Sequence, residues 1–244
     1  MSTQIETKIA LVTGANKGIG YEIARQIGKT GAIVLLGARN ADRGQAAARA
    51  LVEDGIAASW LPLDVTNAQS IDAAAARIAE QHGRLDILVN NAGIGDGADG
   101  APSTASLDAV RKVFETNFFG ALAVTQAMLP LLRRVGKARI VNVSSNLGSL
   151  TLNGDASWVA YGVKLIGYNA SKAALNMLTV QLAAELRDSN ITVHSICPGL
   201  TATDLTGHAG DRPPAEGAEA PVRAALTEGD RTGYFADAQG DIPW

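Results

Sequence analysis

The chain has 244 residues, of which 47% are hydrophobic and 18% charged, and its net charge is −3. This length can bury the core of a single α/β domain, and no apolar stretch approaches the ~18 residues that a bilayer-spanning helix needs. The slightly negative charge and the lack of Lys- or Arg-rich runs argue against nucleic acid as the main partner.

The N-terminus and the rarer residues restrict the class of protein further. Segment 1–8 is polar and lacks the apolar core of a secretory signal. Cys197 is the only cysteine, so no internal disulfide forms, as expected in a reducing compartment. His82, His194 and His208 are scattered without metal-ligand spacing, so no metal is expected. We therefore predict a cytoplasmic protein without membrane attachment.

Short apolar runs alternate along the chain with longer, Ala-rich segments of helical period. In chain order, strands are expected at residues 8–12, 32–36, 58–63, 85–89, 139–143 and 191–196. Helices are expected over an isoleucine stripe from Ile19 to Ile27 and at residues 41–53, 68–81, 107–134 and 171–188. Continuous apolar strands that alternate with helices predict an α/β fold: a doubly wound parallel sheet in three α/β/α layers, Rossmann-like and built as a single domain.

Two stretches interrupt this alternation: residues 146–167 and the Gly-, Pro- and Ala-rich residues 207–221. Both follow strands, at the sheet edge where doubly wound folds bind ligands. We expect the second stretch to be a mobile substrate lid. No linker divides residues 1–244, in which we expect a cofactor half at about 1–135 and a catalytic and substrate half at about 136–244.

A glycine loop at residues 14–20 joins the first strand to the first helix. Its three glycines permit a tight turn and a close approach of the backbone to phosphate, and the amides and dipole of the helix would face a dinucleotide pyrophosphate. The alternative, an ordinary glycine-bearing loop, is disfavoured by the strands on either side of the helix. The candidate cofactor contacts in this loop are Gly14, Asn16, Lys17, Gly18, Ile19 and Gly20.

The residues that end the second strand choose between the two nicotinamide cofactors. An NAD-binding protein usually has an acid there, which accepts a hydrogen bond from the ribose 2′-hydroxyl. This chain has Gly37, Ala38 and Arg39 instead, and the guanidinium can pair with a 2′-phosphate. With Lys17 as a second cation, we expect NADP(H) to be the cofactor. Each cation taken alone is equally compatible with a solvated side chain.

The ends of the third and fourth strands offer contacts for the adenosine. Asp64, followed by Val65, can accept from the adenine amino group or can cap the helix that follows. Asn91, Ala92 and Gly93 end the fourth strand, and the small side chains let the backbone approach the ligand. Asn90 or Asn91 is equally suited to a structural role, in which its side chain would tie neighbouring strands together.

Tyr168 and Lys172 are four residues apart at the start of a helical run, so their side chains share one face. A free tyrosine has a pKa of about 10, and a nearby Lys⁺, helped by oxidised nicotinamide, favours its phenolate form. Tyr168 can then donate a proton to a carbonyl oxygen or remove one from an alcohol. The bare pattern also fits an interfacial tyrosine beside a solvated lysine. Tyr161 and Lys164 are a decoy, because they are three residues apart in a helix-poor stretch.

Two further polar residues favour the catalytic interpretation. Ser145 follows the fifth strand at the ligand edge and can hydrogen-bond a substrate oxygen as charge develops on it. Ser144 is the alternative if the strand register differs. Asn117 lies inside the long expected helix, where Asn has no propensity advantage. It can join a water chain behind Lys172, distort the helix locally, or do both.

The chain resembles the short-chain dehydrogenase/reductase family from end to end. The motifs that carry the resemblance are, in order, the glycine loop, residues 90–93, Asn117, Ser145, Tyr168 and Lys172. Segments 14–20 and 37–40 further resemble the NADPH-dependent carbonyl reductases of the family. The resemblance implies hydride transfer between NADPH and a ketone or aldehyde, reversible in the direction of alcohol oxidation.

By this resemblance Tyr168 is the catalytic acid/base, Ser145 orients the carbonyl, and Asn117 completes a proton relay. Lys172 lowers the pKa of Tyr168 and binds the nicotinamide ribose, so Tyr168 and Lys172 also count among the cofactor contacts. The remaining cofactor contacts that it implies follow the sixth strand and are Pro198, Gly199, Thr201 and Thr203.

One departure from the family pattern is the spacing of the catalytic residues. Tyr168 follows Ser145 by 23 residues, more than in most family members. The extra residues, which include Gly154, Trp158 and Tyr161, would rim the substrate pocket or cover the helix of Tyr168. That helix commonly builds the family's oligomer interface, so a homo-oligomer and a monomer are both compatible with the sequence.

Other functions on the same fold remain as alternatives. A protein that senses NADP without turnover should lack the tyrosine or the lysine, and both are present. A lyase or dehalogenase typically lacks the glycine cradle, which is also present. The nearest alternative is an NAD-preferring alcohol dehydrogenase, and in either case the expected partner is a small carbonyl compound or alcohol.

Overall fold

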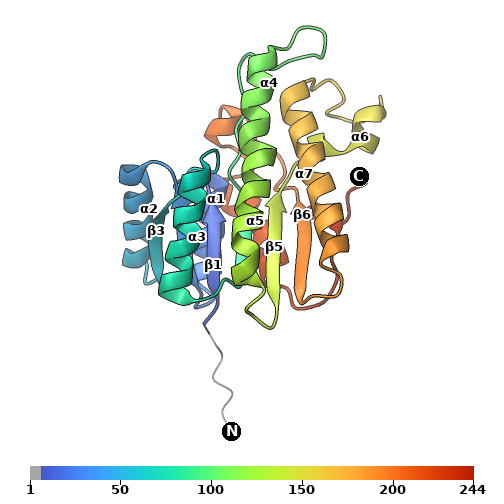
Figure 1. Cartoon of the computed structure of the whole chain (residues 1–244). Helices are drawn as coiled ribbons and strands as arrows, with labels where there is room; N and C mark the ends of the chain where they lie inside the picture. Colours follow the sequence, from blue (N-terminus) through green and yellow to red (C-terminus); the bar gives the residue numbers. More distant parts are fainter. Residues whose placement is uncertain (1–6) are drawn as a thin grey trace.

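Seven strands form one parallel sheet, in the order β3-β2-β1-β4-β5-β6-β7, in the computed structural model, which describes residues 7–244 (Figure 1). The strands are β1 (Ile9–Thr13), β2 (Ile33–Ala38), β3 (Ala58–Pro62), β4 (Ile87–Asn90), β5 (Ala138–Val143), β6 (Ile191–Ile196) and β7 (Tyr234–Ala236). The sequence predicts that segment 1–8 is not a secretory signal. Most of this segment lies outside the described residues.

Helices cover both faces of the sheet and complete three layers. They are α1 (Gly18–Gly28), α2 (Ala41–Glu53), α3 (Ala68–His82), α4 (Leu107–Phe114), α5 (Ala121–Leu132), α6 (Leu150–Gly154), α7 (Ile166–Glu185) and α8 (Pro214–Leu226). On one face the core joins α1, α2 and α8 to the sheet, and on the other it joins α3, α5 and α7 (Figure 1). Among residues 7–244, no helix is both long and apolar enough to cross a membrane.

The side chains of β1 show why both faces of the sheet are covered. Ala10 and Val12 pack in the core layer of α1 while Leu11 packs in the opposite layer, and all three are fully buried. Ile23 and Ile27 of the isoleucine stripe are fully buried as well. The doubly wound, single-domain α/β fold is therefore confirmed, whereas the division into a cofactor half and a catalytic half stays a prediction.

Two helices differ from the sequence prediction. The helix expected at 107–134 consists of α4, a π-helical turn (Glu115–Gly120) and α5. The helix expected at 171–188 begins at Ile166 instead, because the Asp99 carboxylate caps its first turn. In the first case a π-helical turn interrupts the helix, and in the second a cap comes from a distant loop.

The prediction of a mobile lid at 207–221 is wrong for its second half, which belongs to α8. Pro214 stands in the first turn, where its missing N–H removes no helix hydrogen bond. A Cβ on Gly217 would lie 2.5 Å from the Thr201 hydroxyl, so this glycine allows a close approach. Ala218 and Ala225 are buried, and the small residues therefore reflect tight packing. Strand β7, three residues long, is also absent from the prediction.

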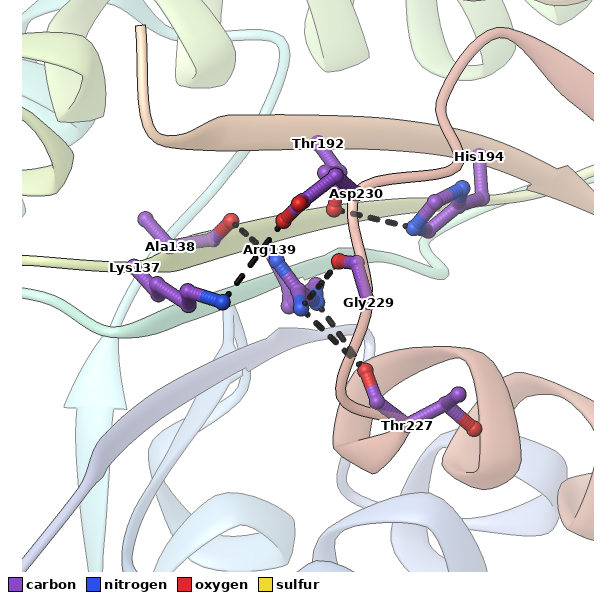
Figure 2. A network of polar contacts seen from close by, with 8 residues as sticks. All are labelled: Lys137, Ala138, Arg139, Thr192, His194, Thr227, Gly229 and Asp230. Carbon is purple, nitrogen blue, oxygen red and sulfur yellow. Dashed lines mark hydrogen bonds and ion pairs between the residues drawn. The ribbon is translucent and has the colours of Figure 1, made fainter.

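Arg139, near the start of β5, holds the connection from α8 to β7 in place. It is 7% exposed, and its Nη2 donates to the Thr227 and Gly229 carbonyls at 3.2 and 2.8 Å (Figure 2). Thr227 is the C-cap of α8, where the helix dipole also favours a cation. Nearby, His194 is buried with its Nε2 3.0 Å from the Thr192 hydroxyl. Burial lowers the pKa of His194 to about 4, so the ring is uncharged at neutral pH.

Arg139→Met should lower the free energy of unfolding by about 1–3 kcal/mol, because it leaves carbonyls of the connection without donors. Urea denaturation measures the change, and hydrogen exchange should increase over residues 227–236. Lys137→Met is the matched control, since that side chain is 62% exposed and pairs with Asp230 at 3.6 Å. An equal loss in both variants, or none in Arg139→Met, would contradict this role.

Candidate active site

The glycine loop bends tightly between β1 and α1, where the strand order reverses. Gly14 and Gly18 have φ angles of +64° and +59°, a backbone conformation that favours glycine. Gly20 has no room for a side chain, since a Cβ there would lie 2.3 Å from Asn91 Nδ2 and 2.6 Å from the Gly14 carbonyl oxygen. This packing holds the first turn of α1 at the sheet edge, with its free amides available to an anion.

A cleft of about 560 Å³ opens over this loop, at the switch point between β1 and β4. Its size suits a bound cofactor, and most of the predicted cofactor contacts meet in it. The predicted residues that line it are Gly14, Asn16, Lys17, Gly18, Ile19, Gly20, Arg39, Asp64, Val65, Asn91, Ala92, Gly93 and Thr203.

Three predicted contacts after β6 do not line this cleft. Thr201 is 2% exposed and its hydroxyl donates to the Gly199 carbonyl at 3.2 Å. Gly199 packs closely on Arg212, whose guanidinium also donates to the Pro198 carbonyl at 3.1 Å. These three residues pack within the loop after β6. Of the four contacts predicted there, Thr203 alone lines the cleft.

Two exposed cations line the cleft where β2 ends and α2 begins. Arg39 follows β2, and Arg43, in the first turn of α2, is a second cation that the sequence interpretation missed, although its position four residues after Arg39 was a signal. Partial burial raises the pKa of Asp64, but hydrogen bonds from Thr66 and the charge of Arg39 outweigh this and lower it. Asn67 caps α3, so Asp64 does not have the capping role considered for it.

A second group of predicted residues meets where β5 ends and α7 begins. Ser145 follows β5, while Tyr168 and Lys172 stand one turn apart on α7. Lys172 is 4% exposed, and its Nζ lies 5.7 Å from the centre of the Tyr168 ring and donates to the Val143 carbonyl at 2.8 Å. Tyr161, the decoy, lies in the insert and is 39% exposed.

Asn117 lies on the π-helical turn and is 1% exposed. It accepts from the Ile94 amide at 2.8 Å and donates to the Ser171 hydroxyl at 3.0 Å. A Cβ on Gly93 would lie 3.5 Å from Asn117 Oδ1 and 3.6 Å from Lys172 Nζ, so both side chains flank the same glycine. The helix is thus distorted at Asn117, and such π-helical turns are frequent at functional sites. The side-chain amide of Asn117 also lies near the Lys172 ammonium.

Burial sets the protonation of the two central groups. Desolvation, with a smaller effect of the Cys197 thiol, raises the pKa of Tyr168 to about 12, and hydrogen bonding with Ser145 only partly opposes this. Desolvation also lowers the pKa of Lys172 to about 8. The Lys172 ammonium is not among the groups that shift the pKa of Tyr168 in the protein alone, so the prediction that Lys172 and oxidised nicotinamide together favour the phenolate stays a prediction. At neutral pH the Tyr168 phenol keeps its proton, as a general acid must.

Asp99 positions Tyr168 and was not identified from the sequence. Its carboxylate accepts from the amides of Gly167 and Tyr168 at 2.9 and 2.8 Å. Because helix N-termini favour negative charge, this contact fastens the loop after β4 to the first turn of α7. An aspartate so far from the helix in sequence gives no local signal of such a contact.

The insert between Ser145 and Tyr168 lies against both α7 and the last residues of the chain. Asn169 of α7 donates to the Val163 carbonyl at 3.2 Å, which is the covering position considered for the insert. The Thr151 amide and hydroxyl donate to the Trp244 carbonyl at 2.9 and 2.7 Å. Within residues 7–244, no three His, Cys, Asp or Glu side chains gather where they could hold a metal ion.

Known proteins match the chain over nearly its whole length. The sequence model of the family described as short chain dehydrogenase matches residues 8–213. The short-chain dehydrogenase anuI of Penicillium roqueforti (strain FM164) is 38% identical, covering 96% of this chain and 94% of the relative. Carbonyl reductase (NADPH) 1 of Mus musculus is 34% identical, covering 97% and 98%. The crystal structure of NADPH-bound carbonyl reductase from chicken fatty liver is 28% identical, with a TM-score of 0.86, covering 98% of this chain and all of that one.

The family match includes both the glycine loop and the Ser-Tyr-Lys group, and relatives above 30% identity align almost end to end. The resemblance found in the sequence is therefore confirmed. The chain belongs to the short-chain dehydrogenases/reductases, a family of oxidoreductases that use a nicotinamide cofactor.

Proposed function

We propose that this protein is an NADPH-dependent carbonyl reductase that converts ketones or aldehydes into alcohols and works reversibly. The observation that carries the proposal is that Tyr168, Ser145 and Lys172 meet next to Gly93, which lines the cleft over the glycine loop. The NADPH-dependent carbonyl reductases among the relatives support the same reaction. A small carbonyl compound or alcohol is the expected partner.

The glycine cradle fits the cofactor, because a Cβ on Gly20 would fill the space that lets α1 approach the strand ends. The glycine loop would hold the pyrophosphate at the first amides of α1. Arg39 and Arg43 would face a 2′-phosphate, and neither Gly37 nor Ala38 provides an acid to repel it. When bound, NADPH would supply the hydride that reduces the carbonyl carbon.

The chain's own residues supply the proton that the carbonyl oxygen takes up. Ser145 donates a hydrogen bond to the carbonyl oxygen, on which negative charge develops. Tyr168 gives its proton to the same oxygen, so the phenolic O–H bond breaks as the alcohol O–H bond forms. The Lys172 ammonium stabilises the phenolate that remains, and a water chain past Asn117 returns a proton to it.

Tyr168→Phe should lower kcat for carbonyl reduction by about 10²- to 10⁴-fold, because no other group at the site supplies the proton. The dissociation constant of NADPH, measured by fluorescence titration, should stay nearly unchanged. Tyr161→Phe is the matched control and should keep full activity. If Tyr168→Phe also kept full activity, the acid would lie elsewhere.

Arg39→Asp should shift the ratio of NADPH to NADH dissociation constants by about 10- to 100-fold toward NADH, since a carboxylate repels the 2′-phosphate and accepts from a 2′-hydroxyl. Calorimetric titration with each cofactor measures the ratio. Arg49→Asp makes the same charge change on an exposed part of α2 outside the cleft and should leave the ratio alone. An unchanged ratio in Arg39→Asp would remove Arg39 from cofactor selection.

The pH profile of carbonyl reduction should report the charge of Lys172. Reduction needs a protonated Tyr168, a condition met up to its pKa of about 12, and a charged Lys172, which requires a pH below its pKa of about 8. kcat/KM should therefore be level at lower pH and fall about tenfold per pH unit above that value. Lys172→Arg should move the fall to higher pH. A profile that stayed level well above the lysine pKa would contradict this assignment.

A further inference from the structure

The Asp204 carboxylate, in the loop after β6, lines the cleft and offsets the charge of Lys17, one of the cations there. Asp204 Oδ2 forms an ion pair with the Lys17 ammonium of the glycine loop, and Asp204 Oδ1 lies 3.1 Å from His208 Nε2. All three side chains line the cleft. Arg39 and Arg43, the cations where β2 ends and α2 begins, form no ion pair in the part of the chain that the structure describes.

The backbone fixes the place of this carboxylate. Asp204 opens a short 3₁₀ turn (Asp204–Thr206) in which the Thr206 hydroxyl accepts from the Thr203 amide at 3.1 Å and donates to the Thr201 carbonyl at 2.8 Å. Thr203 also lies over the glycine loop, because a Cβ on Gly18 would meet its Cγ2 at 3.7 Å. The two loops therefore meet across the cleft.

His208 gives the carboxylate a second partner. Its φ of +61° makes it the one non-glycine residue in the left-handed region among residues 7–244. This conformation is unfavourable for most side chains, although His tolerates it better than many. The left-handed turn returns the imidazole to Asp204, so the carboxylate has a second partner besides Lys17.

We propose that Asp204 is a specificity-determining residue that competes with the 2′-phosphate of NADPH for Lys17. The proposal rests on the NADPH dependence proposed above. While Lys17 faces Asp204, the positive charge of Lys17 is offset, so the ammonium attracts an incoming phosphate less strongly. Arg39 and Arg43 supply the remaining attraction. Asp204 thus weakens the hold on a phosphorylated cofactor, with little effect on an unphosphorylated one, and so favours the release of NADP⁺ that each turnover requires.

The test uses two probes that differ only in the 2′-phosphate, adenosine 2′,5′-bisphosphate and adenosine 5′-monophosphate, with binding measured by isothermal titration calorimetry. Asp204→Asn should tighten binding of the bisphosphate by about threefold to fivefold, the size expected for an exposed ion pair, and alter binding of the monophosphate by less than about twofold. In a Lys17→Met background, Asp204→Asn should change neither affinity, as a double-mutant cycle requires.

Asp211→Asn is the matched control, because it makes the same charge change in the same loop but outside the cleft. It should bind both probes like the wild type. Weaker binding of the bisphosphate to Asp204→Asn would mean that the carboxylate aims Lys17 at the phosphate, and would overturn the proposal. Unchanged binding, equal tightening of both probes, or tightening that persists without Lys17 would overturn it as well.

The same titrations separate this proposal from the one on which it rests. A wild-type protein that binds the two probes equally contradicts the NADPH preference. In that case the competition for Lys17 still stands if Asp204→Asn creates a preference for the bisphosphate, and it is refuted if no preference appears.

Discussion

The contact between the glycine loop and the end of β4 is the constraint on which the whole site depends. Asn91 Nδ2 donates to the Thr13 carbonyl at 2.8 Å, and the Thr13 hydroxyl accepts from the amides of Asn91 and Ala92 at 3.0 and 2.9 Å. Gly20 lets α1 pack directly on this asparagine. Asn91 therefore has the strand-tying role considered for it, and the same contact places the helix N-terminus at the ligand edge.

A buried polar network sets the position of α7 against the sheet in a similar way. Asn142 on β5 accepts from the Asn90 amide at 2.9 Å and donates to the Thr179 hydroxyl of α7 at 2.8 Å. The Thr179 hydroxyl in turn lies 2.8 Å from that of Ser195 on β6. Because such groups are costly when unpaired, the network specifies one arrangement of α7 on the strands. With Asp99 at the helix start, it holds Tyr168 near Ser145, which follows β5.

The features that could be predicted from the sequence are those that leave a pattern among neighbouring residues. The apolar strands, the glycine loop and the one-turn spacing of Tyr168 and Lys172 are patterns of neighbouring residues, and the fold and family that they indicated are confirmed. Helix α8 was missed because its Ala, Gly and Pro residues serve packing against distant elements. Asp99 contacts α7 from another loop, and the pKa of Tyr168 follows burial rather than the lysine. Long-range contacts and burial of this kind arise only when the chain is folded, so no local sequence pattern indicates them.

Turnover with NADPH and with NADH, measured against a panel of ketones, aldehydes and quinones, tests the proposed reaction most directly. We expect NADPH oxidation with one or more of these carbonyl compounds, and faster oxidation of NADPH than of NADH under the same conditions. Tight NADPH binding without turnover across the whole panel would contradict the reductase and favour a protein that senses the cofactor. Faster turnover with NADH would contradict the cofactor assigned to the cleft.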